Sequence, residues 1–167
     1  VIELDMMYQA GKSMLESIHY MMPDGPDESG RLLGQNFSDD RFEVVSTVPT
    51  YSEWYMNTIH RETYQRHKRA MQLIGAYEPD KRWLFKYPVH MRNLDALLEA
   101  YPDACIIWTH RDPADVLPSY VSLCAHFRSL FEHSVDREQI AIDQKEAWAR
   151  AVENGMRLRK GREHQFH

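Results

Sequence analysis

Two short apolar runs with a leucine-rich segment between them are the clearest pattern in the chain. Residues 104–109 form a nearly continuous apolar run rich in residues that favour β-structure, as expected for a strand covered on both faces. Residues 82–86 form a similar run, and residues 89–100 place leucines on one face of a helix. A strand, a helix and a strand at this spacing predict a right-handed βαβ unit with parallel strands.

Helical periodicity accounts for most of the remaining chain. Recurring apolar positions predict helices over residues 1–20, 27–37 and 50–75, from residue 113 onward, and over residues 137–159. Asp112 and Asp136 are placed to cap the last two of these helices. Thr50 and Glu53 match a capping box at the start of the third. Residues 126–136, between the last two helices, are expected to be a looser segment.

The length of 167 residues suits one domain with a real core and is too short for two. Together the elements predict an α/β fold that is rich in helices and contains a parallel sheet. We expect a helical part at residues 1–80 and a strand–helix–strand–helix core at residues 81–167. The chain starts within a predicted helix, and a further strand is expected to start at residues 163–167. The domain is therefore expected to be partial and cut at both ends.

Charge and composition narrow the class of partner. The formal net charge is -5 and no long run of lysine and arginine occurs, which argues against a nucleic-acid surface. No apolar run approaches the length of a membrane span. Cys105 and Cys124 lack the spacing of metal ligands and are expected to be buried thiols in a reducing compartment. A cytoplasmic location follows from that expectation.

Polar side chains with useful chemistry follow both predicted strands. Lys86 and His90 lie at the end of the first strand, and Arg111 lies at the end of the second, with Ser119 two helical turns later. Since parallel strands deliver their carboxyl ends to one crevice, these four side chains are expected to meet one ligand. Lysine and arginine suit an anion, and histidine accepts a proton near neutral pH. Three of these residues also have a plain structural explanation. Lys86 is then a surface lysine, His90 a solvent-facing turn residue, and Arg111 a partner of Asp115.

Two weaker signals also have structural explanations. Gly11-Lys12-Ser13 is similar to the end of a phosphate-binding loop, but Met6 occupies the position of the required earlier glycine, so a solvated helical turn is favoured. His60 and His67 are seven residues apart and share a helix face, but no third metal ligand is evident. No metal site is expected.

Longer motifs around the two strands resemble the sulfotransferase family, most closely its bacterial-type branch. That branch has K-S-P-x-H, L-D-A-L-L, Y-P-D-A and H-R-D-P in this order, and an earlier P-S-Y-x-x-W. The chain carries matching sequences over roughly residues 19–166, at 49–54, 86–90, 94–98, 101–104 and 110–113, followed by Ser119. The block from residue 83 to residue 123 is specific.

The resemblance implies a three-layer P-loop-type α/β sandwich. It implies transfer of a sulfuryl group from 3′-phosphoadenosine 5′-phosphosulfate to a hydroxyl or amine of a small-molecule, carbohydrate or lipid acceptor, with no metal required. Arg111 and Ser119 match the pair that holds the 3′-phosphate of the donor. His90 is the candidate base for the acceptor, and Lys86 is expected to stabilise charge on the transferred group.

Two departures from the family pattern keep alternatives open. Tyr87 replaces the usual small residue after the lysine, and the strand–loop–helix that holds the 5′-phosphosulfate is absent from these residues. The chain alone is therefore expected to be inactive. A nucleotide-binding module without transfer chemistry is one alternative, and a kinase of the same broad fold is another.

Overall fold

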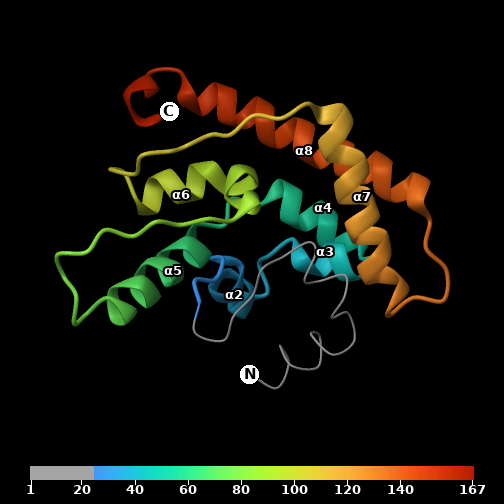
Figure 1. Cartoon of the computed structure of the whole chain (residues 1–167), viewed down its shortest axis with the longest axis horizontal. Helices are drawn as coiled ribbons and strands as arrows, with labels where there is room; N and C mark the ends of the chain where they lie inside the picture. The colour runs from blue at the N-terminus through green and yellow to red at the C-terminus, as the bar shows by residue number, and fades with distance from the viewer. Residues whose placement is uncertain (1–24) are drawn as a thin grey trace.

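The computed structural model describes residues 25–167, and helices dominate this part of the chain (Figure 1). Its α-helices are α2 (Gly30–Leu33), α3 (Arg41–Val45), α4 (Pro49–Asn57), α5 (Arg61–Ile74), α6 (Leu94–Ala100), α7 (Pro113–Ser129) and α8 (Arg137–Arg159). The described part also has the 3₁₀ helices η1 (Gly34–Asn36), η2 (Pro88–Asn93) and η3 (Glu163–Gln165). The helix predicted over residues 1–20, with its Gly11-Lys12-Ser13 sequence, lies outside the described residues.

Local side-chain signals mark the starts of the two longest described helices. The Asp112 carboxylate accepts a hydrogen bond from the Ala114 N–H at 2.8 Å at the start of α7. The Asp136 carboxylate accepts one from the Gln139 N–H at 3.0 Å at the start of α8. Both predicted caps are confirmed, because each carboxylate satisfies an N–H that has no partner within its helix.

The helix predicted over residues 50–75 is broken into α4 and α5. Thr58 donates its hydroxyl to the Trp54 carbonyl at 2.7 Å, and a ring nitrogen of His60 bonds the Tyr55 carbonyl at 3.0 Å. These side chains take carbonyls that would accept the next backbone bonds of the helix, so α4 ends at Asn57.

Two other predicted boundaries are wrong. No side chain caps α4, which starts with Pro49 in its first turn, so the capping box of Thr50 does not form. α7 reaches Ser129, so it includes the first four residues of the predicted loose segment. Its last turn is fastened by Arg128, whose Nη2 donates to the Glu43 carbonyl of α3 at 2.6 Å.

Two segments occur where strands are expected, and one of them pairs. Ile106 forms a parallel bridge with Phe166. The Ile106 N–H donates to the Gln165 carbonyl at 2.6 Å, and the His167 N–H donates to the Ile106 carbonyl at 2.9 Å. This single bridge lies within the stretch where a strand is expected to start, although Glu163–Gln165 form the 3₁₀ helix η3. Residues 82–86 pair with no strand within residues 25–167, so a wider parallel sheet stays a prediction.

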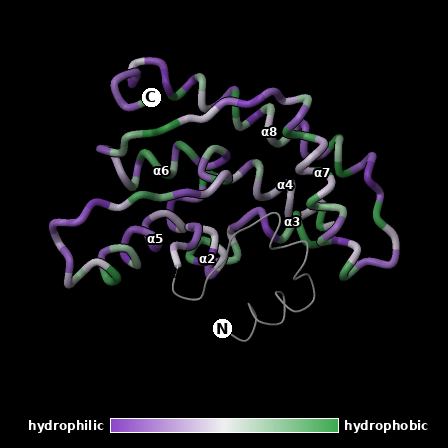
Figure 2. The backbone as a smooth tube through the Cα atoms, in the orientation of Figure 1, coloured by the Kyte–Doolittle hydropathy of each residue, from purple (hydrophilic) through white to green (hydrophobic). Residues whose placement is uncertain are grey.

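Residues 104–108 are covered on one face only. Ala104, Ile106 and Trp108 pack on the core, whereas the alternating Cys105 and Ile107 point away, and Ile107 is 72% exposed. The prediction of two buried thiols therefore holds for Cys124 and is wrong for Cys105. The described helices cover only one side, which explains the exposure. Figure 2 shows hydrophobic stretches on the two long connections between helices, residues 75–87 and residues 101–112.

The core has two parts. The larger gathers the leucines of α6 with Leu33, Tyr64, Leu158 and Phe166. The smaller lies between α7 and α8, around Cys124, Ala125 and Ile140, of which Cys124 and Ile140 are fully buried. α8 also packs on η2. This packing places η2, which carries His90, and α7, which carries Ser119, against a common helix.

Candidate functional site

The first predicted site segment, which carries Lys86 and His90, lies where the extended residues 82–87 lead into η2. The His90 N–H donates to the Tyr87 carbonyl at 3.1 Å, which closes the turn. Lys86 forms an ion pair with Glu28, and its side chain is 69% exposed. Exposed ion pairs add little to stability, since water screens them. The Lys86 ammonium therefore remains at the surface, next to the turn.

His90 lies below that surface. Its Nδ1 shares a 2.8 Å hydrogen bond with the hydroxyl of Tyr64, which is 1% exposed. Its Nε2 is buried and has no hydrogen-bond partner in the described part of the chain. Burial, followed by the nearby His67, lowers the pKa of His90 to about 3. The imidazole is neutral at neutral pH, as a base must be before it accepts a proton.

The two histidines considered for a metal are engaged in hydrogen bonds. His60 bonds the Ser38 hydroxyl and the Tyr55 carbonyl, and Nδ1 of His67 bonds the Tyr101 hydroxyl at 2.8 Å. Within residues 25–167 no three histidine, cysteine or carboxylate side chains gather as a metal site would require. Desolvation lowers the pKa of His67 to about 4.

The second predicted site segment leads into α7. Arg111 lies just before the helix and Ser119 lies within it, and both are exposed. Neither side chain makes a hydrogen bond or ion pair with residues 25–167, so the alternative pairing of Arg111 with Asp115 does not form there. No such bond joins them directly to Lys86 or His90 within the same residues. The four predicted residues thus lie on two separate segments. Lys86 and His90 are engaged with Glu28 and Tyr64.

A buried network of tyrosine hydroxyls and carboxylates connects these two segments. The Tyr87 hydroxyl lies 2.8 Å from Oδ1 of Asp39 and 3.0 Å from Oδ1 of Asp40, so its proton is shared between the two carboxylates. The Tyr120 hydroxyl donates to Oδ2 of Asp40 at 3.0 Å. Tyr87 is the residue that departs from the family pattern, and that departure was the available signal.

Charges of both signs are buried beside this network. Nη1 of Arg92 donates to Glu43 at 2.8 Å and lies 3.9 Å from Oδ2 of Asp40. Burial raises the pKa of Asp40 to about 7. Asp39 raises it further, while Arg92 and the two tyrosine hydroxyls oppose the rise. Asp40 therefore changes its charge near neutral pH.

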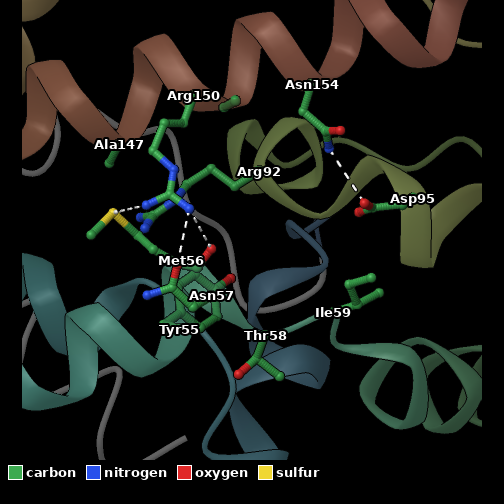
Figure 3. Close-up of a pocket in the computed structure, with 11 residues that line it drawn as sticks. Tyr55, Met56, Asn57, Thr58, Ile59, Arg92, Asp95, Ala147, Arg150 and Asn154 are labelled. Atoms are coloured by element: carbon green, nitrogen blue, oxygen red, sulfur yellow. Dashed lines mark hydrogen bonds between the residues drawn. The ribbon is translucent and has the colours of Figure 1, made fainter.

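A polar pocket of about 330 Å³ lies on the other side of η2, between the end of α4, α6 and α8 (Figure 3). Arg150 extends from α8 and donates to Asn57 at 3.0 Å, and Asn154 donates to Asp95 at 3.5 Å. The residues lining it are Tyr55, Met56, Asn57, Thr58, Ile59, Arg92, Asp95, Ala147, Arg150, Ala151 and Asn154. The internal hydrogen bonds show that these polar groups chiefly hold the helices together.

The family model of the sulfotransferase family matches residues 3–167, which is nearly the whole chain. The chain belongs to the sulfotransferase family. No curated protein sequence matches it. Among solved structures it is similar to the sulfotransferase STF1 from Mycobacterium tuberculosis H37Rv, with 30% sequence identity and a TM-score of 0.77.

That match covers 95% of this chain and 46% of the mycobacterial sulfotransferase. The chain thus spans less than half the length of this relative. The likeness supports an α/β class for the sulfotransferase chain, although its described part is mostly helical. No helix within residues 25–167 is long and apolar enough to cross a membrane.

Proposed function

We propose that the protein transfers a sulfuryl group from 3′-phosphoadenosine 5′-phosphosulfate to a hydroxyl or amine of a small-molecule, carbohydrate or lipid acceptor. The observation that carries the proposal is the sulfotransferase family match over residues 3–167, which includes both strand-end segments. The free thiols of Cys105 and Cys124 suit a cytoplasmic location. The proposal assigns no step to a metal ion.

The donor side of the proposed site is the start of α7. Arg111 and Ser119 are exposed and have no partner within residues 25–167, so their N–H and O–H groups are available for the 3′-phosphate. A guanidinium holds a phosphate with paired hydrogen bonds, and a hydroxyl adds a third donor. The Asp112 cap orients the first turn beside them.

The transfer side is the segment that carries Lys86 and His90. The acceptor oxygen attacks the sulfur, and the bond between that sulfur and the 5′-phosphate oxygen breaks, which releases adenosine 3′,5′-bisphosphate. We propose that Lys86 stabilises the negative charge on the transferred group and its leaving oxygen. The exposure of its ammonium supports this role.

His90 is the proposed base that takes the proton of the acceptor. When Nδ1 carries the ring proton and donates it to the Tyr64 hydroxyl oxygen, Nε2 keeps the lone pair that a base requires. Its low pKa keeps the ring neutral. Because Nε2 is buried, an acceptor reaches it only by displacing the groups that cover this nitrogen.

The covered Nε2 atom also favours a second candidate, a module that binds the nucleotide without transferring the group. The two are separated by incubating the full-length protein with donor labelled in its sulfuryl group and a panel of phenols, sugars, lipids and amines. Labelled product with release of the bisphosphate supports the transferase. Binding of adenosine 3′,5′-bisphosphate without labelled product from any acceptor supports the module, and neither binding nor product overturns both.

A further inference from the structure

Asp40 lies between the two segments of the proposed site. It is 3% exposed and stands directly before α3. One of its oxygens accepts from Tyr87 and the other accepts from Tyr120, each at 3.0 Å. Tyr87 directly follows Lys86 in the sequence, and Tyr120 directly follows Ser119. One carboxylate therefore connects neighbours of a proposed transfer residue and of a proposed donor-binding residue.

We infer that Asp40 is a positioning residue that holds the Lys86–His90 segment in register with helix α7. The inference rests on the proposed function, because the register matters only if one substrate spans both segments. Asp40 itself is not a catalytic residue in this scheme. Both its oxygens are taken by tyrosine hydroxyls below the surface, so it touches no reacting group.

Both tyrosines are suited to be donors. Burial raises the pKa values of Tyr87 and Tyr120 well above that of a free tyrosine, and the nearby Asp40 raises them further. Each hydroxyl therefore keeps its proton over the whole neutral range and donates it to the carboxylate. A carboxylate has acceptor sites on both oxygens, whereas an amide has an acceptor on one side only. When it is ionised, the acid at position 40 accepts from both tyrosines at once, which an amide in its place does not.

The connection is stiff at both ends. A Cβ on Gly30 would lie 2.7 Å from Cζ of Tyr87, so the phenol ring fits closely over a residue without a side chain. On the other side, Nη2 and Nε of Arg128 donate to the Glu43 carbonyl of α3 at 2.6 and 3.1 Å. Since α3 is fastened to α7 in this way, a displacement at Asp40 moves one segment relative to the other.

Binding of the product and catalytic turnover respond differently to a loss of register. The bisphosphate is held mainly by Arg111 and Ser119, which belong to one segment, so its affinity is expected to change less than threefold. Transfer needs both segments. A misplacement of about 1 Å between reacting groups costs about 100-fold in rate, so a fall of about 10- to 100-fold in kcat is expected. A merely structural role would lower the amount of folded enzyme and leave kcat per binding site unchanged.

The test uses the full-length protein and the variants Asp40→Asn and Tyr120→Phe. Bisphosphate binding is titrated by calorimetry to count intact sites, and kcat per site is measured with the labelled donor. Tyr101→Phe is the matched control, because it removes a half-buried tyrosine hydroxyl bond of 2.8 Å, to His67, away from Asp40. Tyr120→Phe decides the question if Asp40→Asn does not accumulate as folded protein.

The expected result is a fall in kcat per site for both variants, near-normal bisphosphate affinity and no such fall for the control. The double variant, with Asp40→Asn and Tyr120→Phe together, should be no slower than Asp40→Asn alone, because both changes break the same connection. Wild-type kcat per site in Tyr120→Phe overturns the inference while leaving the proposed function intact. A wild-type protein that binds the bisphosphate but transfers nothing overturns the proposed function, and the inference with it.

Discussion

The pH dependence of stability offers a direct measurement of the burial of Asp40. The carboxyl pKa is raised from 3.8 to about 7, so the folded protein holds this proton at pH values where the unfolded chain has released it. Its contribution to stability is therefore fully present below about pH 4 and is lost as the pH rises through about 7. A pKa difference of about three, at about 1.4 kcal/mol for each pKa unit, corresponds to about 4 kcal/mol.

The perturbation is Asp40→Asn, which cannot ionise. The free energy of unfolding of wild type and variant is measured by urea denaturation of the full-length protein at several pH values between about 5 and 8. The difference, wild type minus variant, should fall by about 3 kcal/mol across this range, with most of the fall below about pH 7. The loss of a hydrogen bond in the variant adds an offset that does not depend on pH, so only the slope is diagnostic.

Histidine ionisation does not obscure the result. The lowered pKa values of His67 and His90 make the protein less stable as the pH falls below about 6.5, but both residues are present in wild type and variant. Their contribution cancels in the difference. Tyr101→Phe keeps Asp40 and should run parallel to wild type. Parallel curves for Asp40→Asn and wild type would refute the raised pKa and the desolvation that causes it.

Three further substitutions test the site and the core. Arg111→Ala should weaken binding of adenosine 3′,5′-bisphosphate by about 10-fold or more, since a charge-assisted contact to phosphate is lost; calorimetry with unchanged affinity would remove Arg111 from the donor site. His90→Ala should lower kcat by about 100-fold or more while the donor Kd changes little, as expected on losing a base; an unaltered kcat would end that assignment. Ile140→Ala, at a site with 0% exposure, should reduce the free energy of unfolding by about 2 to 5 kcal/mol in urea denaturation, and a loss below about 1 kcal/mol would show that α7 and α8 repack.

Sequence reasoning succeeded where the decisive interaction is local. Asp112 and Asp136 cap helices through N–H groups two and three residues away, so the sequence alone contains both partners. It failed at residues 50–75, where Thr58 and His60 turn back to carbonyls that a continuous apolar stripe does not reveal. The parallel pair predicted between residues 82–86 and 104–109 is not seen within residues 25–167, where Ile106 bridges Phe166 instead.

For the candidate site, too, the sequence identified the residues but not the contacts that place them. Lys86, His90, Arg111 and Ser119 were found from strand ends and family motifs. We infer that their relative placement depends on Asp40, which lies between the helices predicted at residues 27–37 and 50–75. Two adjacent acids in a loop ordinarily indicate a solvated surface. Tyr87, Tyr120 and Arg92, which lie beside these acids, come from far along the chain, and no local pattern records such partners.

The parallel bridge between Ile106 and Phe166 has a consequence for the order of folding. All of α7 and α8 lies between its two sides, so closing it carries the entropic cost of a long loop. The helices pack around Ile140 through nearer contacts, and we expect them to form before the strands meet. The His167 amide, which donates to the Ile106 carbonyl, should then exchange its hydrogen with solvent faster than the amide of the fully buried Cys124. Equal protection in native-state hydrogen exchange would instead place the bridge in the same cooperative unit as the helices.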